Sequence, residues 1–529
     1  MNSNRDAVLQ ELIENAENGY NKVESAFIVF EGVFFNELSK ETYESLKKRG
    51  KSRLSFPKAR AKCARVSDSL NKAYFSNDNF ATLSAEDDET DEEVLFAIDK
   101  LGRAVQTYTK NMKLFTSLQT NIRKTPYLGT AISKSYWDGT KVALESVDID
   151  DIKFDPDAKT PESVTYYTHD IYKTKGEIEK LIKDGVFNLI EKGADLFGGE
   201  SKIMSKRIKL TDIYTLQDDG TWTVSTYYKQ TILRLDSKLA DGQPFNFGGL
   251  IPQLRRIGEE ESVMAYYEPL IMPLVPLQDE YNIRRNQQID AVKMVLSPKV
   301  ITPKTAGIDP LALINPNISA VLANNITQGS VIPIPTPNIQ AAAFDTQTMD
   351  HDMSEVSGVS PMMQGLSNDK SKTATEKGIE HSEGSIKLES YVRSFNETFF
   401  NPLMQRITNL IWKYGNPKYF AGVNRRIDLN YLVDFNTGLG VTNDIVKRDN
   451  LGQAFSMMTS LLDVQTSLGQ QDEALQTVIG IKKVVKETLP LIGIKNADEY
   501  LGKDNNYESN TGTNGTKSAL GTFRQAQYG

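Results

Sequence analysis

The architecture can be worked out from residues 276–296, which read PLQDEYNIRRNQQIDAVKMVL. Glu280 and Arg284 stand four residues apart in the order that stabilises a helix, so we predict a helix over the whole segment. Its middle, residues 282–290, is polar nearly all round, with only two isoleucines. A helix that is polar on every side fits poorly inside a globule. We interpret it as a strut with solvent or a channel on one side and a neighbouring subunit on the other.

The segment that follows is rich in proline. Residues 297–338 contain prolines at 298, 303, 310, 316, 333, 335 and 337. Proline lacks an amide hydrogen and clashes with the preceding helical turn, so this density excludes a long helix and predicts short strands and turns. Residues 339–357 return to a helical pattern, and a polar loop, PMMQGLSNDKSK, follows at 361–372.

The longest periodic segment, residues 376–414, begins after this loop. It opens with TATE at 373–376, which fits a capping box of a hydroxyl residue followed three positions later by Glu. Apolar residues then recur on one stripe until GNP at 415–417, which is typical of a helix end. Because Pro402 lies inside the segment, we predict a kink near residues 398–400.

The remaining C-terminal sequence changes character twice. Residues 427–435 have the pattern of a strand, and residues 444–500 are again helical. The last stretch, residues 503–529, is polar and rich in Gly, Ser, Thr and Asn, so we expect it to be disordered.

The N-terminal third is predicted to be helical over residues 6–50 and 94–122. Between these helices lie two blocks of opposite charge. Residues 47–65 hold nine Lys or Arg and no acid, whereas residues 86–93 are almost entirely acidic. The blocks could pair with each other, pair with a neighbouring copy, or form two solvated faces.

The region 141–235 has the alternating pattern of β-strands, strongest at 208–216, 221–228 and 231–235. Asp218-Asp219-Gly220 between two of these runs predicts a β-hairpin. A short helical pattern at 171–190 interrupts the region. Residues 240–262 contain Gly and Pro and are expected to form a loop.

Composition excludes several classes of protein. The 529 residues are too many for one core, and 39% apolar with 25% charged residues is a globular composition. The formal charge of −8 would repel a phosphate backbone, which disfavours a protein that grips DNA by many phosphates. No signal peptide and no run of 18 apolar residues is found, so we expect a soluble protein that needs no membrane.

Signs of catalysis or cofactor binding are weak. One cysteine, Cys63, and three histidines exclude a disulfide framework, a thiolate metal site and a multi-histidine site. No glycine-rich loop has the spacing needed to hold a nucleotide phosphate. Five aspartates at 148–157 could hold Mg²⁺ or Ca²⁺, but ordinary turn chemistry is the stronger interpretation. His381 is read as a surface residue, and we predict no cofactor, no metal and no enzyme activity.

Several short motifs occur in a recognisable order. They are KSRLSFP (51–57), GTA (129–131), KSYW (134–137), FDPDA (154–158), GQPF (242–245), GGLIP (248–252), YEPL (267–270), PLQDEYN (276–282) and TATE (373–376). Together they resemble the portal (head-to-tail connector) proteins of tailed double-stranded DNA bacteriophages, especially the short-tailed type. The resemblance spans residues 45–440. It departs from the family at Glu268-Pro269, where a small residue or glycine is expected.

The resemblance implies an α+β, mostly helical portal fold with wing, stem, clip and crown, assembling as a closed ring. The implied parts follow in chain order: an N-terminal helical segment (1–45), the wing (46–269), a first stem helix (270–296), the clip (297–338), a second stem helix (339–358), a tunnel loop (359–375), a long kinked helix with a return to the wing (376–443), a helical crown (444–502) and the polar tail (503–529).

The same resemblance implies the partners and the contact residues. The ring, commonly of twelve copies, would pass double-stranded DNA non-specifically and dock the terminase large subunit, a head–tail adaptor, and the major capsid and scaffolding proteins. It would lie at the capsid portal vertex of the virion, after assembly in the host cytoplasm. Candidate residues are Lys370, Lys372, Asn368 and Ser371 in the tunnel loop, Arg284, Arg285 and Lys293 on the stem, and Lys299, Lys304 and Asp309 in the clip.

Two other functions compete with this hypothesis. The packaging motor itself would need a phosphate-binding loop, which we do not find. Another virion component, such as a tail or capsid scaffold without a DNA channel, is the remaining alternative.

Overall fold

A computed structural model shows two compact units, Met1–Gly438 and Leu439–Gly529. The structure describes residues 2–38, 40–75, 81–85, 91–188, 207–252, 265–296, 300–301, 332–333, 347–359, 386–427, 429–435, 455–460 and 481. In the second unit it describes only a helical stretch, 455–460, and Ile481, which agree with the helix predicted over 444–500 as far as they reach.

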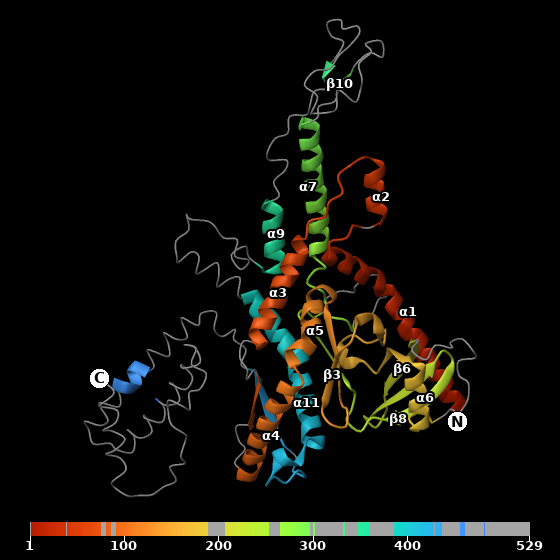
Figure 1. Ribbon diagram of the computed structural model, residues 1–529, viewed down its shortest axis with the longest axis vertical. Coiled ribbons are helices and arrows are strands. Elements are labelled where there is room, and N and C mark those ends of the chain that lie inside the picture. Colours follow the sequence, from red (N-terminus) through yellow and green to blue (C-terminus); the bar gives the residue numbers. More distant parts are fainter. Residues whose placement is uncertain are drawn as a thin grey trace. The chain divides into compact units, whose positions relative to one another are not determined.

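Five helices form most of the N-terminal third (Figure 1). They are α1 (Asn2–Phe35), α2 (Lys40–Lys48), α3 (Lys58–Phe75), α4 (Glu92–Asn111) and α5 (Leu114–Leu128). Helix α4 begins where the Asp91 side chain accepts a hydrogen bond from the amide of Glu93, an N-cap that satisfies one free donor of the first turn. The helices predicted over 6–50 and 94–122 are therefore confirmed.

Two antiparallel sheets carry the β-structure between α5 and helix α7 (Leu274–Leu296). The larger has the order β4-β5-β6-β7-β8 and the smaller β3-β2-β9. Their strands are β2 (Thr130–Trp137), β3 (Val142–Ser146), β4 (Ile152–Phe154), β5 (Tyr166–Thr174), β6 (Arg207–Leu216), β7 (Trp222–Tyr228), β8 (Thr231–Lys238) and β9 (Phe245–Gly249). The hairpin predicted at 218–220 joins β6 to β7 and is confirmed.

Three boundaries in this region were predicted wrongly. The helix expected over 171–190 is α6 (Lys175–Lys183), because β5 continues to Thr174, whose side chain caps the helix at Glu177. Residues 245–249 are not loop but strand β9, which pairs with β2. Gly248 is required there, since a Cβ would lie 2.5 Å from the Cβ of Phe399. Strand β2 itself begins before the region in which strands were expected.

A short sheet joins distant parts of the chain. Strand β1 (Ala81–Ala85), which was not predicted, pairs antiparallel with β12 (Tyr431–Phe435). The strand expected over 427–435 is therefore confirmed only in its second half. Residues 81–85 read ATLSA, a run too short and too small to signal a strand by itself.

Aromatic side chains fill the core between the sheets. The rings of Phe154 and Phe247 lie 4.8 Å apart, Tyr167 and Tyr214 stack at 5.0 Å, and Phe245 meets Tyr167 edge-on at 5.4 Å. Such pairs stabilise the core beyond the area that they bury. Cys63 lies in the same apolar cluster, and its burial raises the pKa of the thiol to about 12, so it behaves as a core residue.

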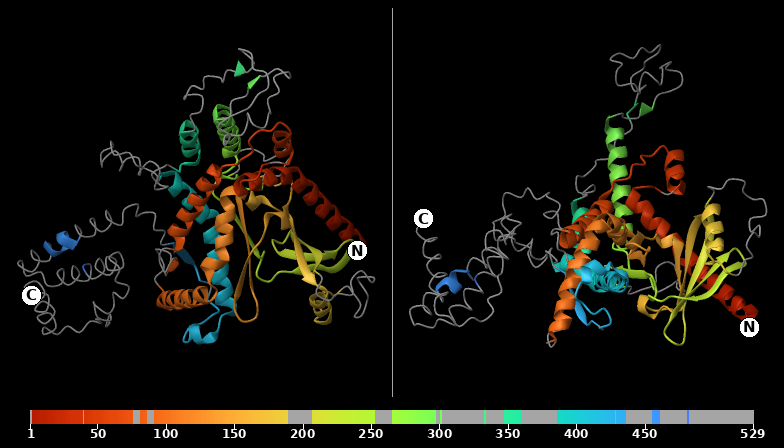
Figure 2. Two further views of the ribbon diagram at one scale, coloured as in Figure 1. Left: turned by 45° about the horizontal axis from the view of Figure 1, so that its top comes forward. Right: turned by 60° about the horizontal axis from the view of Figure 1, so that its bottom comes forward.

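Helix α7 (Leu274–Leu296) projects from this body, in agreement with the helix predicted over 276–296. Beyond it, β10 (Val300–Ile301) pairs antiparallel with β11 (Ile332–Pro333), and α9 (Gln347–Ser357) returns beside α7. Figure 2 shows α7 from two further directions. The prediction of short strands between two helices is thus confirmed at the residues that the structure describes.

The long helix is interrupted where proline predicts it. Residues 386–395 are helical, a π-helical turn η5 spans Asn396–Phe400, and α11 runs from Asn401 to Tyr414. Pro402 has no amide hydrogen to give to residue 398, and the wider π turn absorbs that missing bond. Gly415 follows as the C-cap. The capping box at 373–376 lies outside the described residues.

Candidate functional site

Helix α7 carries four hydrogen-bonding side chains at four-residue spacing, Gln278, Asn282, Asn286 and Asp290. Because an α-helix turns once every 3.6 residues, they lie on one face, and we call them the polar ladder. The first three are almost fully buried, at 3%, 6% and 7% exposure. A buried amide must find hydrogen-bond partners or the fold loses stability.

The partners are backbone groups of segment 52–59, which comprises the stretch 52–57 and the first two residues of α3. The amide hydrogens of Leu54 and Phe56 are donated to the Oδ1 atoms of Asn286 (2.9 Å) and Asn282 (3.0 Å). Ala59 N–H donates to Gln278 Oε1 at 2.8 Å. At the other end of the ladder, Ser52 N–H donates to Asp290 Oδ1 at 3.0 Å.

The ladder also donates to the same segment. Asn286 Nδ2 donates to the Leu54 carbonyl and Gln278 Nε2 to the Phe56 carbonyl, both at 2.7 Å. Two residues of extended chain span about 6.6 Å, and one four-residue helical step spans about 6 Å. This near match explains why Ser52, Leu54 and Phe56 meet successive steps of the ladder, in antiparallel order.

The interpretation of α7 as a helix wet on both sides is therefore wrong for this face. Its polar side chains are not solvated but serve as a hydrogen-bonding surface for a neighbouring backbone. An adjoining face does reach solvent, and Ile283 is 57% exposed there. If a neighbouring subunit packs on that face, an exposed apolar side chain such as Ile283 is expected there.

The basic block 47–65 makes contact with α9. Lys58 Nζ lies 3.3 Å from Asp350 Oδ2, and Lys62 Nζ lies 3.8 Å from Asp350 Oδ1. Lys62 is only 1% exposed, and it donates to Ser354 Oγ at 2.6 Å. Burial lowers the pKa of the Lys62 ammonium, while the Asp350 carboxylate opposes that fall. Residues 86–90 of the acidic block lie outside the described part of the chain.

The C-terminal end of α9 is held by donors from two other elements. Lys387 Nζ donates to the carbonyls of Glu355 (3.0 Å) and Val356 (2.9 Å), and Lys62 Nζ donates to that of Val359 (3.3 Å). Cations are favourable at this end of a helix because its last carbonyls lack partners. Gly358 completes the end with a φ of +71°, a conformation that favours glycine.

The three predicted stem residues have different surroundings. Arg284 forms an exposed ion pair with Glu280 at 2.6 Å, four residues earlier on α7. Arg285 donates to Gln288 Oε1 at 2.7 Å, and its guanidinium lies 5.7 Å from the centre of the Phe56 ring. Lys293 donates to Ser52 Oγ at 2.6 Å, so it extends the ladder.

The other predicted site residues lie outside the described residues. They are Lys370, Lys372, Asn368 and Ser371 of the tunnel loop and Lys299, Lys304 and Asp309 of the clip. His381 lies outside them as well. These positions therefore stay predictions.

The ladder and its backbone partner are functional features that sequence reasoning missed. The signal was present, since Gln278, Asn282, Asn286 and Asp290 repeat every four residues. Their polarity leads instead to the interpretation of solvent or a channel on one side and a neighbouring subunit on the other, because a sequence does not say which backbone will lie against an amide. The segment 51–57 was noted only as a motif and a run of positive charge.

The acidic cluster at 148–157 is explained by structure. Lys124 binds Asp148, Tyr20 donates to Asp150 at 2.5 Å, and Asp155 accepts from the Asp157 amide at 3.0 Å. Within the described part of the chain, no group of His, Cys, Asp and Glu side chains has the arrangement of a metal site. None of the described helices has the length and apolar character needed to cross a membrane.

A cleft of about 450 Å³ lies between α1 and the larger sheet, lined by Glu17, Lys153, Asp170 and Lys209 among others. Lys153 and Lys209 each place Nζ 2.8 Å from Asp170 Oδ2. Both ammonium groups are thus paired with the same carboxylate inside the cleft.

Comparison with protein families matches residues 282–518 to the family described as the phage SU10 portal protein. The match begins inside the polar ladder, includes β10, β11, α9 and α11, and covers rather less than half of the chain. A comparison with curated proteins gives no match. Portal proteins are structural components of the virion. The mixed α+β architecture, in which helices α7 and α9 flank the paired strands β10 and β11 in the chain, is compatible with this family. In agreement with the resemblance seen in the sequence, residues 282–518 are thus similar to a family of phage portal proteins.

Proposed function

We propose that the chain is the subunit of a closed ring at one capsid vertex, through which double-stranded DNA is packaged and later ejected. The proposal rests on one feature of the fold. Helix α7 leads to the paired strands β10 and β11, and helix α9, which follows them in the chain, lies beside α7. Two helices side by side, with a pair of antiparallel strands between them in chain order, suit a projection that surrounds a channel and docks other proteins.

The parts are assigned along this path. Helices α7 and α9 are the two stem helices, and residues 297–338 are the clip, which docks the terminase motor and afterwards the tail adaptor. The two sheets belong to the wing at 46–269. Residues 359–375 are the tunnel loop, and 444–502 form the crown inside the capsid. The copy number is twelve, and the virion is of the short-tailed type.

The charge of the chain suits passage rather than binding. Duplex DNA carries about one charge per 1.7 Å of axis, so a strongly basic lining would hold it. In this chain 61 Lys and Arg residues are more than offset by 69 Asp and Glu residues, which gives the net charge of −8. Arg284 is a stem candidate for the lining, since it is balanced by Glu280 and its side chain is exposed. Lys293 is engaged by Ser52 in the single chain.

Lys370 and Lys372 are proposed to touch DNA phosphates briefly, with Asn368 and Ser371 beside them. Asp369 and Glu376 offset their charge. The double variant Lys370→Ala/Lys372→Ala should package DNA more slowly or retain it less well, measured as DNA per capsid over time. Lys180→Ala/Lys183→Ala on α6 is the matched control. Normal packaging and retention in the tunnel-loop variant would contradict the contact role.

The function as a whole is tested by removing the chain from the virus. Phage that cannot make it should assemble capsids without DNA, and supplying the chain should restore filled heads. The labelled chain should lie at one vertex of each capsid. Filled heads in its absence, or label distributed along the tail, would contradict the proposal and favour another virion component.

A further inference from the structure

We propose that helix α2 of one copy docks, through its basic C-terminal end, on the acidic outer face of helix α9 in the next copy of the ring. This inference rests on the proposed ring and names one contact that closes it. The partner is a second copy of this chain, and the contact joins two different surfaces.

Helix α2 packs only loosely on the part of the chain that the structure describes. It has nine residues, all of them described, and none is buried. Its largest apolar side chain, Tyr43, is 39% exposed. An isolated helix of this length is unstable in water, because nucleation costs more than so few hydrogen bonds return. The helix therefore needs another surface to pack against.

The C-terminal end of α2 is strongly basic. Five of the seven residues 47–53 are Lys or Arg. Lys47 lies 3.5 Å from Glu44, an exposed pair on the same helix, and Arg53 lies over the Tyr43 ring. Within the described part of the chain, Lys48 and Arg49 form no ion pair. Positive charge stabilises the C-terminal end of a helix, but this end carries more positive charge than that effect requires.

Helix α9 presents the opposite charge on its outer face. Its inner face is occupied, since Met353 is buried and Asp350 holds Lys58 and Lys62. Asp352 and Glu355, three residues apart, are both exposed. Neither carboxylate forms an ion pair with any residue that the structure describes. Val356 is exposed beside them and offers an apolar contact for Tyr43.

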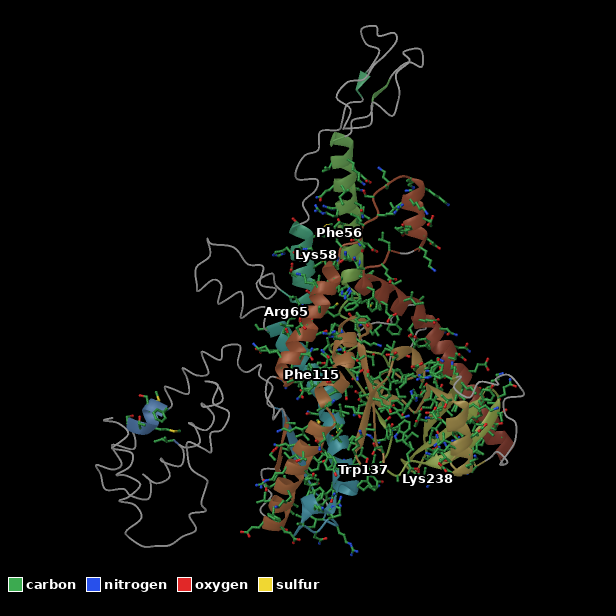
Figure 3. All side chains as sticks on the ribbon, in the orientation of Figure 1. Phe56, Lys58, Arg65, Phe115, Trp137 and Lys238 are labelled. Atoms are coloured by element: carbon green, nitrogen blue, oxygen red, sulfur yellow. The ribbon has the colours of Figure 1, made fainter. Side chains whose placement is uncertain are left out.

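The two surfaces lie on opposite sides of α7 (Figures 1 and 2). The ladder ties residues 52–59, which follow α2, to one face of α7, and the ion pairs at Asp350 tie α9 to α3. Figure 3 shows Phe56 and Lys58 at the junction of these helices. One copy cannot bring α2 onto its own α9 without breaking the ladder. Complementary surfaces on opposite sides of a subunit build a head-to-tail ring.

The test uses two charge-reversal variants of the full chain. Lys48→Glu/Arg49→Glu makes α2 acidic, and Asp352→Lys/Glu355→Lys makes α9 basic. Each variant alone places like charges across the contact, so we expect the association constant between neighbours to fall at least about tenfold. Native mass spectrometry and negative-stain imaging would count rings. The defect should shrink in 1 M salt, where the screening length falls to about 3 Å.

The decisive step is to mix the two variants in equal amounts. Each acidic α2 then meets a basic α9, and each remaining basic α2 meets an acidic α9, so rings should form again with alternating copies. Lys180→Glu/Lys183→Glu makes the same charge change on α6, another nine-residue helix, and should form rings as the wild type does. Circular dichroism would show that the single variants keep their helix content.

A cross-linking variant checks the contact independently of charge. Lys48→Cys/Asp352→Cys places one thiol on each surface, and the natural Cys63 is buried. A short bifunctional thiol reagent should yield a series of covalent oligomers up to the full ring, whereas either single cysteine variant should yield none. Absence of this series in assembled rings would overturn the contact.

The outcomes separate this inference from the function on which it rests. If the wild type forms no rings, the proposed function fails. If the wild type forms rings and either reversal variant does so equally well, the α2–α9 contact is wrong while the ring stands. If both variants lose rings and their mixture does not regain them, the contact is also wrong.

Discussion

Helix α7 and the larger sheet are held to the rest of the chain in two different ways. The face of α7 that meets segment 52–59 is held by side-chain amides bonded to backbone groups. The sheet is held by packed aromatic rings such as Phe154, Tyr167 and Phe245. The first contact is directional and fixes register to one residue, whereas the second grows with buried area and tolerates small shifts.

The difference suits the proposed roles of the two regions. A stem helix must keep one face matched to its own chain while the other face meets a neighbour or a channel. Polar contacts allow this without an apolar stripe that would aggregate before assembly. The wing has no such constraint and can rely on its core. The following predictions test this contrast.

The largest effect is expected in the aromatic core. Phe154 is fully buried, with its ring 4.8 Å from Phe247 and 4.9 Å from Tyr266. Phe154→Ala should lower the free energy of unfolding by about 3–5 kcal/mol, because it removes apolar contacts and leaves a cavity. Urea denaturation at fixed protein concentration measures the change. Phe96→Ala, at an exposed ring on α4, should cost far less, and equal costs would contradict the assignment of the core.

The second effect is a pH dependence that arises at the sheet. Burial, with Lys134 nearby, lowers the pKa of His169 from 6.5 to about 4. The unfolded chain therefore binds a proton between pH 6.5 and 4 that the folded chain does not, so stability falls as the pH falls through that window. The loss amounts to at most about 3 kcal/mol.

The variant His169→Gln isolates this contribution. Its unfolding free energy should fall less than that of the wild type between pH 7 and pH 4, as measured by urea denaturation at each pH. His351→Gln, at an exposed position on α9, should keep the wild-type profile. A wild-type slope that His169→Gln leaves unchanged would show that His169 is not buried neutral.

The third effect belongs to the polar ladder. Asn286→Leu leaves the amide and the carbonyl of Leu54 without their partners, so it should cost about 2 kcal/mol of stability. Hydrogen exchange at the Leu54 amide should also become faster. Gln287→Leu changes the exposed neighbour on the same helix and should do neither. If the two variants behave alike, the ladder does not hold segment 52–59.

The smallest effect on stability is expected at Arg284. Its pair with Glu280 is exposed, so Arg284→Ala should change the unfolding free energy by about 0.5 kcal/mol or less. If Arg284 faces the channel, DNA packaging should change although stability does not. Measuring both separates a lining role from a structural one. A large loss of stability would place this side chain in a contact between copies.

The elements that could be predicted from the sequence are those with a strong local signal. The period of α11, the proline at 402 and the hairpin at 218–220 each act within a few residues, and each is confirmed. The order of nine short motifs led to the portal family, which the comparison supports over 282–518.

The elements that failed depend on partners far away in sequence. Strand β9 forms because β2 lies beside it and because Gly248 admits Phe399. Strand β1 forms because β12, some 350 positions later, pairs with it. The polarity of α7 follows from the sequence, but the partner of its ladder face does not, since segment 52–59 precedes the helix by more than 200 residues.

The most direct test of the portal assignment is electron microscopy of the purified full-length chain, with the copies in each particle counted. The account predicts closed rings with an open bore, in which α7 lies beside segment 52–59 of the same copy. Particles that remain single at every protein concentration, or open filaments without a bore, would contradict it.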